Sequence, residues 1–139
     1  MAEAMVVVVA GVAVEDGRVM LCRRKKDALE GEKWEFPGGK LERGESPEAA
    51  LARELREELN VSVRVGRLLD AIVHPRSPYP DRGILLLYYA VRIAAGQPEP
   101  VDVGGIAWAT PDELPGYDFA PADALFLSRG GITDAVSDI

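Results

Sequence analysis

Residue types that often carry out catalysis are scarce in this 139-residue chain. Cys22 is the only cysteine, which excludes an internal disulfide and suits a reducing, cytoplasmic compartment. It lies in an apolar run, where a lone thiol is expected to fill the core rather than to act as a nucleophile. The only histidine, His74, precedes Pro75, and we interpret it as an ordinary loop residue. Neither residue is a strong candidate for a catalytic group.

Positive charge and long apolar segments are also in short supply. The chain has 16 Lys and Arg against 23 Asp and Glu, and a net charge of −7 argues against a nucleic-acid partner. The run Val6–Val14 is too short to span a membrane, and the first ten residues lack the basic segment of a signal peptide. Length and a hydrophobic fraction of 47% are typical of one domain over residues 1–139, either monomeric or homodimeric.

Hydrophobic periodicity and chain breakers predict strands interrupted by two helices. Strands are expected over residues 5–14, 18–23, 34–36, 61–72, 84–93 and 106–109. The main helix is expected over 47–59, because Ser46 is a good N-cap and Pro47 fits the first helical position. A short helical turn begins at Thr110, a second helix covers 121–129, and the tail from Gly130 is expected to fray. The pattern favours an α/β fold, an α/β/α sandwich around a central mixed sheet.

The most informative segment is 39–61, where a glycine-rich loop runs into a helix with Glu54, Glu57 and Glu58 on one face. Residues three and four apart are neighbours on a helix, so the three carboxylates cluster within one turn. Like charges at that spacing are unfavourable, but hard oxygen donors on a rigid element are what Mg²⁺ prefers. The alternative is a solvated amphipathic helix in which Arg53 and Arg56 offset the acids.

As a whole, this segment resembles the signature of the Nudix hydrolases. That signature reads Gly, five residues, Glu, seven residues, Arg-Glu, an aliphatic residue, any residue, Glu-Glu, any residue, Gly, an aliphatic residue. Every fixed position is met except that Asn60 stands where Gly is usual, and Asn is the next most tolerant residue of a left-handed helix cap. The flanking segments 34–40 and 80–82 are similar to the MutT-type branch, the nucleoside triphosphate pyrophosphohydrolases. The family also implies the α/β/α sandwich.

The resemblance implies roles for individual residues, beginning with a Mg²⁺ site at which Mn²⁺ can substitute. The expected metal ligands are the backbone carbonyl of Gly38 and the carboxylates of Glu54, Glu57, Glu58 and Asp102. Asp102 stands where the family more often has Glu, six residues before Trp108, and its alternative is an ordinary turn residue. Glu45 is expected to support the site, and Arg53 to orient the acids by ion pairing.

The implied reaction is attack by a metal-activated water on the β-phosphorus of a nucleoside triphosphate, which releases nucleoside monophosphate and pyrophosphate. Metal ions neutralise the phosphate oxygens and lower the pKa of bound water, and a carboxylate accepts the proton. We favour Glu54 or Glu57 as that base, with Asp102 as the rival. No serine, cysteine or histidine nucleophile is required.

The segment 119–125 resembles the start of the C-terminal helix in this branch, where one side chain reads the base edge. Its Ala-Pro-Ala-Asp form, which ends at Asp123, is similar to the bacterial CTP pyrophosphohydrolases, whereas enzymes that prefer 8-oxoguanine commonly have Asn there. An ionised Asp only accepts hydrogen bonds and suits the N4 amino group of cytosine. A protonated Asp can donate and accept as Asn does, so 8-oxo-dGTP is also a candidate substrate. The alternative for Asp123 is an N-cap or first-turn acid.

Other residues are candidates for substrate contact, and three functional hypotheses remain. Arg24 and Arg82 are candidates for contact with base or phosphates, and Tyr79 is a candidate for stacking on the base. The alternative for each is an ordinary solvent-exposed residue.

The favoured function is hydrolysis of cytidine triphosphates or 8-oxo-dGTP. A Nudix hydrolase of a nucleoside diphosphate derivative such as ADP-ribose needs room for a second moiety, which a short chain does not offer. A nucleotide-binding regulator with a dead site conflicts with the complete set of glutamates.

Overall fold

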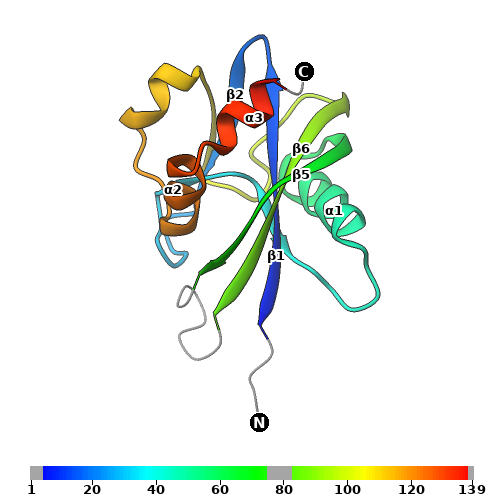
Figure 1. Ribbon diagram of the computed structural model, residues 1–139. Helices are drawn as coiled ribbons and strands as arrows, with labels where there is room; N and C mark the ends of the chain where they lie inside the picture. Colours follow the sequence, from blue (N-terminus) through cyan, green and yellow to red (C-terminus); the bar gives the residue numbers. More distant parts are fainter. Residues whose placement is uncertain (1–4, 75–82, 138–139) are drawn as a thin grey trace.

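The computed structural model describes residues 5–74 and 83–137. A central mixed sheet has helix α1 (Pro47–Leu59) on one face, and helices α2 (Pro121–Ser128) and α3 (Gly131–Ser137) on the other (Figure 1). The predicted α/β/α sandwich is therefore confirmed. None of the described helices is long and apolar enough to cross a membrane.

Strand β1 is the centre of the sheet. The strands of the described residues are β1 (Val6–Glu15), β2 (Arg18–Arg23), β3 (Trp34–Glu35), β4 (Gly38–Lys40), β5 (Ser62–His74), β6 (Ile84–Ala95) and β7 (Gly105–Ala109). β1 pairs in parallel with β6 and antiparallel with β2 and β4. β5 is antiparallel to β6, while β3 and β7 both pair with β2. The parallel β1–β6 pair makes the sheet mixed, as the sequence predicted.

The first two strands, β1 and β2, form a hairpin with a two-residue turn. Asp16 and Gly17 have φ angles of 52° and 74°, the positive values that a type I′ turn requires. Because β1 is central, it buries side chains on both faces: Val9 packs on the α1 side and Val12 on the α2 and α3 side. Cys22 on β2 is fully buried, and burial raises the pKa of its thiol, which confirms its place in the core.

Helix α1 begins and ends where its sequence signals predicted. Oγ of Ser46 accepts a hydrogen bond of 3.1 Å from the N–H of Ala49, and Pro47 opens the helix. Asn60 follows the last helical residue in the left-handed region, with a φ of 57°, so it can replace the usual glycine. The buried stripe of Ala50, Leu51, Leu55 and Leu59 fixes the rotation of the helix, so that its acidic face is turned away from the core.

The C-terminal segment differs from the prediction. The tail from Gly130 was expected to fray, but it forms α3, in which Ile132 and Ala135 are buried. A Cβ on Gly131 would lie 2.1 Å from the ring of Phe126, so glycine is needed where α3 approaches α2. Packing against the sheet, rather than helix propensity, stabilises this short element. The short helical turn after Thr110 is confirmed as a 3₁₀ helix over Pro111–Gly116.

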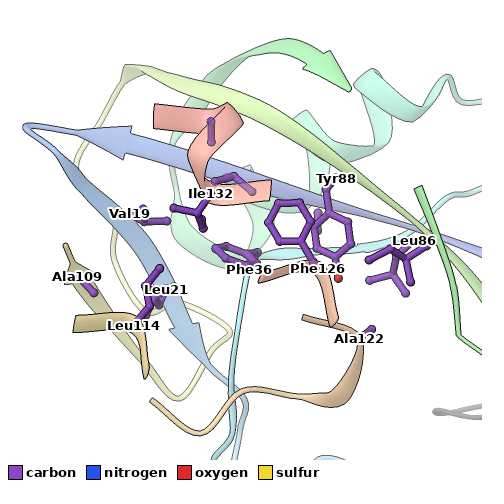
Figure 2. Packing of buried hydrophobic residues seen from close by; sticks show 14 of the residues in the cluster. Val19, Leu21, Phe36, Leu86, Tyr88, Ala109, Leu114, Ala122, Phe126 and Ile132 are labelled. Carbon is purple, nitrogen blue, oxygen red and sulfur yellow. The ribbon is translucent and has the colours of Figure 1, made fainter. Parts of the chain in front are cut away.

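An aromatic cluster fills the core between the sheet and α2. Tyr88 of β6 and Phe126 of α2 stack with ring centroids 4.1 Å apart, and Phe36 meets the Phe126 ring edge to face at 5.4 Å (Figure 2). Tyr88 and Phe126 are fully buried. This packing holds α2 against the sheet through Phe126, near the end of the helix.

Candidate active site

A cavity of about 290 Å³ lies between β1, the loop from β3 to β4, and the start of α2. Its charged or polar lining residues include Arg24, Glu35, Glu58, His74 and Asp123, and its apolar ones include Val8, Phe36, Ile84 and Leu86. The cavity therefore brings Glu58 of α1 and Asp123 of α2, two residues predicted from separate motifs, to one site.

Arg53 holds three of the acids at the edge of this site. Its Nε donates to Glu45 at 2.7 Å, and its Nη1 donates to Glu54 at 3.2 Å and to Glu57 at 2.9 Å. Hydrogen bonding to Arg53 lowers the pKa of Glu45. Arg53 Nη2 also donates to the carbonyl of Lys40 at 3.1 Å, which ties α1 to β4. The arginine thus connects the loop and helix of the motif.

The Gly38-Gly39 pair lets the backbone approach the acids closely. A Cβ on Gly39 would lie 2.3 Å from the carboxyl carbon of Glu54, and one on Gly38 would lie 1.8 Å from the carbonyl oxygen of Val9. The N–H of Gly38 donates to Oε1 of Glu58 at 3.3 Å. Any larger residue at these two positions would push away a neighbouring strand or a carboxylate.

Burial makes Glu54 and Glu58 costly to ionise. Burial, with smaller contributions from the charges of Glu35 and Glu54, raises the pKa of Glu58 to about 8. Burial also raises the pKa of Glu54, although Arg53 opposes the shift. Among the residues that the structure describes, no three acidic, histidine or cysteine side chains converge as metal ligands, and Arg53 is bound to Glu54 and Glu57. The carboxylate oxygens of Glu54, Glu57 and Glu58 are hard donors, and they nevertheless fit a divalent cation such as Mg²⁺ or Mn²⁺.

Asp102 is paired with a lysine rather than left free for a metal. Its side chain is 59% exposed and forms an ion pair with Lys25. Its loop is nonetheless anchored to the end of α1, because the N–H groups of Val101 and Asp102 both donate to the carbonyl of Glu58 at 3.1 Å. The backbone thus places Asp102 beside Glu58, while its carboxylate is held by Lys25, a residue for which no role was predicted.

Arg24 lies in the cavity wall and is paired with Glu35. Its Nη1 donates to Oε1 of Glu35 at 2.7 Å, and its Nε donates to the carbonyl of Leu29 at 2.7 Å. Glu35 was not singled out as a site residue from the sequence. Its position between two aromatic residues was the one sequence signal that could have identified it.

Asp123 is the only charged side chain that is buried among the described residues, at 5% exposure. Its Oδ1 accepts a hydrogen bond of 2.9 Å from the hydroxyl of Tyr88. Burial and the charge of Glu35 raise the pKa of Asp123 to about 8, even though the Tyr88 hydrogen bond opposes the shift. The N-cap of α2 is Ala120, so Asp123 is not an N-cap, whereas the prediction of a first-turn acid is confirmed. Asp123 lies in the first turn and faces inward.

The one histidine of the chain, His74, lies in the wall of the cavity. His74 is the last residue of β5, paired opposite Ile84, and it lines the cavity. The interpretation of His74 as a loop residue is therefore wrong, because pairing with β6 extends the strand beyond its apolar run. The buried Nδ1 of His74 has no hydrogen-bond partner in the part of the chain that the structure describes. Tyr79 and Arg82 lie outside the described residues.

The family profile of the NUDIX domain matches residues 4–129. The chain belongs to the Nudix hydrolases. It is 36% identical to a CTP pyrophosphohydrolase of Escherichia coli K12 over 123 residues, which cover 88% of this chain and 89% of the relative. It is 33% identical to an 8-oxo-dGTP diphosphatase of the same organism, over 83% of this chain and 87% of the relative. The crystal structure of a MutT Nudix hydrolase from Burkholderia pseudomallei superimposes with a TM-score of 0.80 and 29% identity, over 91% of this chain and 98% of that chain.

This Nudix hydrolase is accordingly an enzyme that acts on phosphorus-containing anhydrides, and its relatives are MutT-like. Nudix hydrolases generally use divalent metals such as Mg²⁺. The names of the two relatives differ in the nucleobase, so similarity to them leaves the choice of base to the chemistry of the cavity.

Proposed function

We propose that this Nudix hydrolase is a Mg²⁺-dependent nucleoside triphosphate pyrophosphohydrolase that sanitises the nucleotide pool. It would release nucleoside monophosphate and pyrophosphate from (d)CTP, from modified cytidine nucleotides or from 8-oxo-dGTP. The observation that supports this most is that Glu58 and Asp123 line the same cavity. Glu58 is suited to a metal and the phosphates, and Asp123 is suited to the edge of a nucleobase.

The carboxylate cluster and its arginine account for the phosphate end of the proposal. Glu54, Glu57 and Glu58 would hold the metal with the Gly38 carbonyl, and Asp102 could join them by leaving Lys25. A bound Mg²⁺ or Mn²⁺ would neutralise phosphate oxygens and lower the pKa of a bound water. Arg53 and Glu45 keep the acids oriented through the ion pairs already described.

A carboxylate at this end accepts the proton of the attacking water. Glu54 is the better placed candidate, because its side chain is 18% exposed while that of Glu57 is 55% exposed. Asp102 is the weaker candidate while its carboxylate is paired with Lys25.

The base end of the proposal consists of Asp123 and an apolar slot. Val8, Phe36, Ile84 and Leu86 line the cavity with Asp123 and offer flat apolar surface to a planar base. Asp123 can accept from an amino group when ionised, or donate and accept when protonated. The proposed activity therefore includes both cytidine nucleotides and 8-oxo-dGTP, the nucleotides in the relatives' names.

The test is a panel of substrates with every product identified. Purified enzyme with Mg²⁺ would be offered the common (d)NTPs, 8-oxo-dGTP, 5-substituted dCTP and ADP-ribose. We expect monophosphate and pyrophosphate, with the highest kcat/KM for a cytidine nucleotide or 8-oxo-dGTP. Highest activity on ADP-ribose, with release of ribose phosphate, would overturn the proposal, and so would nucleotide binding without turnover. The Glu58→Gln variant, purified in parallel, controls for contaminating phosphatases.

A further inference from the structure

We propose that Glu35, held by Arg24, is a positioning residue that controls whether Asp123 meets the base as a hydrogen-bond donor or only as an acceptor. Glu35 would thereby set the preference between 8-oxoguanine and cytosine nucleotides and its dependence on pH. This inference rests on the proposed function. It gives a role to a glutamate that the proposed chemistry does not otherwise use.

The backbone places Glu35 next to the start of α2. The N–H of Trp34 donates to the carbonyl of Asp118 at 2.8 Å, and the N–H of Ala120 donates to the carbonyl of Trp34 at 2.9 Å. Strand β3 therefore holds the segment that leads into α2 on both sides of Phe119. Glu35, the next residue of β3, lines the cavity together with Asp123.

Arg24 fixes the carboxylate of Glu35. The guanidinium is bound at two points, the Leu29 carbonyl and Oε1 of Glu35, each at 2.7 Å. The side chains of Arg24 and Glu35 are only 28% and 21% exposed, so water screens the pair less than it would at the surface. A carboxylate held in this way cannot turn out to solvent to escape a neighbouring charge.

Charged and polar groups reach Asp123 from several directions. Tyr88 of β6 donates a hydrogen bond to Asp123. The charge of Glu35, on β3, and the charge of Arg24, which follows β2, also act on its carboxyl group. Farther along the same cavity lie Glu30, Glu58 and His74, and Asp70, which is paired with Arg129, lies near Tyr88. Burial raises the pKa of Asp123 most, and the charge of Glu35 raises it further, while Tyr88, the charge of Arg24 and the backbone of Phe36 oppose the shift.

The protonation state of Asp123 determines which base edge it fits. With Oδ1 bound by Tyr88, the proton of the neutral carboxyl resides on Oδ2, which can donate to O6 of 8-oxoguanine while the group accepts from N7–H. The ionised group only accepts, which suits the N4 amino group of cytosine. Glu35 disfavours ionisation, so it favours the oxidised purine over a wider range of pH.

The experiment measures the ratio of kcat/KM for 8-oxo-dGTP to that for dCTP from about pH 6 to about pH 9, across the range in which a buried carboxyl of this kind titrates. In the wild type, the ratio should fall as pH rises, with a midpoint near the Asp123 pKa of about 8. Glu35→Gln should move the midpoint down by about one pH unit, because a like charge is lost. Glu35→Asp, which keeps the negative charge, should leave the midpoint close to that of the wild type.

Three further variants separate this role from a structural one. Glu30→Gln removes another acid from the cavity wall and should leave the midpoint unchanged. Tyr88→Phe removes the hydrogen bond that favours the ionised form, and it should move the midpoint up. Asp123→Asn should make the ratio independent of pH, and adding Glu35→Gln to it should change nothing more, because Glu35 acts through Asp123.

A second readout does not depend on turnover. The carboxyl carbon of Asp123, followed by NMR in the metal-free protein, should titrate at lower pH in Glu35→Gln than in the wild type. If both nucleotides are hydrolysed but the ratio does not vary with pH, or Glu35→Gln leaves both midpoints in place, the inference is overturned and the proposed function stands. If neither nucleotide is hydrolysed, the proposed function fails, and the role assigned to Glu35 in substrate choice fails with it.

Discussion

The hydroxyl of Tyr88 donates a 2.9 Å hydrogen bond to Oδ1 of Asp123. The Tyr88 ring is fully buried and is stacked on Phe126 inside the core (Figure 2), so packing of the ring fixes the position of the hydroxyl. Asp123 is therefore a buried group that Tyr88 holds at the wall of the cavity. Its chemical state, rather than its orientation, is the variable that can change the choice of base.

Asp123→Asn should change base preference most at alkaline pH, where the wild-type carboxyl is ionised. The amide supplies a donor beside an acceptor, so discrimination against 8-oxo-dGTP should decrease. For dCTP the variant loses a charge-assisted contact with N4, which should cost about 1 kcal/mol, or several-fold in kcat/KM. The measurement is the ratio of the two kcat/KM values at fixed Mg²⁺ and a pH about one unit above the midpoint. An unchanged ratio would leave Asp123 with a purely structural role.

Glu57→Gln and Glu58→Gln should each cut kcat by orders of magnitude without destabilising the metal-free protein. Clustered acids are locally unfavourable on a helix, and they are explained mainly as metal ligands. Turnover and thermal melting in chelator measure the two effects separately. Near-wild-type activity in both variants would remove the metal-site assignment.

Stability of the Glu58→Gln variant should also depend on pH. Folding raises the Glu58 pKa to about 8, so between its ordinary range and about pH 8 the folded state keeps a proton that the unfolded chain has lost. The wild type therefore loses stability as pH rises through that window, and the variant does not. Its Tm relative to wild type should be higher at the upper end of the window than at the lower end.

Local signals in the sequence were sufficient for the parts of the site that lie on α1. The Ser46 cap, Pro47 and Asn60 determine where the helix lies, and the spacing of the glutamates then puts them on one face. The hairpin between β1 and β2 was predictable for the same reason, since its turn and its β-branched strands are adjacent in sequence.

Long-range contacts account for what the sequence could not predict. Helix α3 exists because Ile132 and Ala135 find a core to pack against, and His74 extends β5 because Ile84 lies opposite it. The ion pair of Lys25 with Asp102 joins residues far apart in the chain. None of these contacts leaves a periodic or capping signal, so a single sequence does not reveal them.

Gly39→Ala should reduce activity more than it reduces stability. The added methyl would overlap the carboxyl of Glu54, whose carboxyl carbon lies 2.3 Å from the Cβ position. Because that carboxyl is the far end of a flexible side chain, it can move, and the fold tolerates the change while the acid is displaced. Gly38→Ala is the contrasting variant, since its Cβ would lie 1.8 Å from the backbone oxygen of Val9 and should impair folding itself. Full activity in Gly39→Ala would show that the position of Glu54 is not critical.

Turnover should require Mg²⁺ or Mn²⁺ and should be lost in chelator. Ca²⁺ should bind but support little turnover, because its larger and looser coordination shell misplaces the attacking water. The rate with Mg²⁺ should rise towards alkaline pH as the metal-bound water and the base carboxylate lose protons. Rates measured in metal-depleted enzyme with each ion restored separately test this, and full activity without added metal would contradict the mechanism.

The central claim is that water attacks the β-phosphorus of a nucleoside triphosphate at this site. The most direct measurement is hydrolysis in ¹⁸O-labelled water of whichever of dCTP and 8-oxo-dGTP is turned over faster, with the label located by mass spectrometry. We predict that the label enters pyrophosphate and that the nucleoside monophosphate remains unlabelled. Label in the monophosphate, or release of labelled inorganic phosphate with a nucleoside diphosphate, would contradict this account.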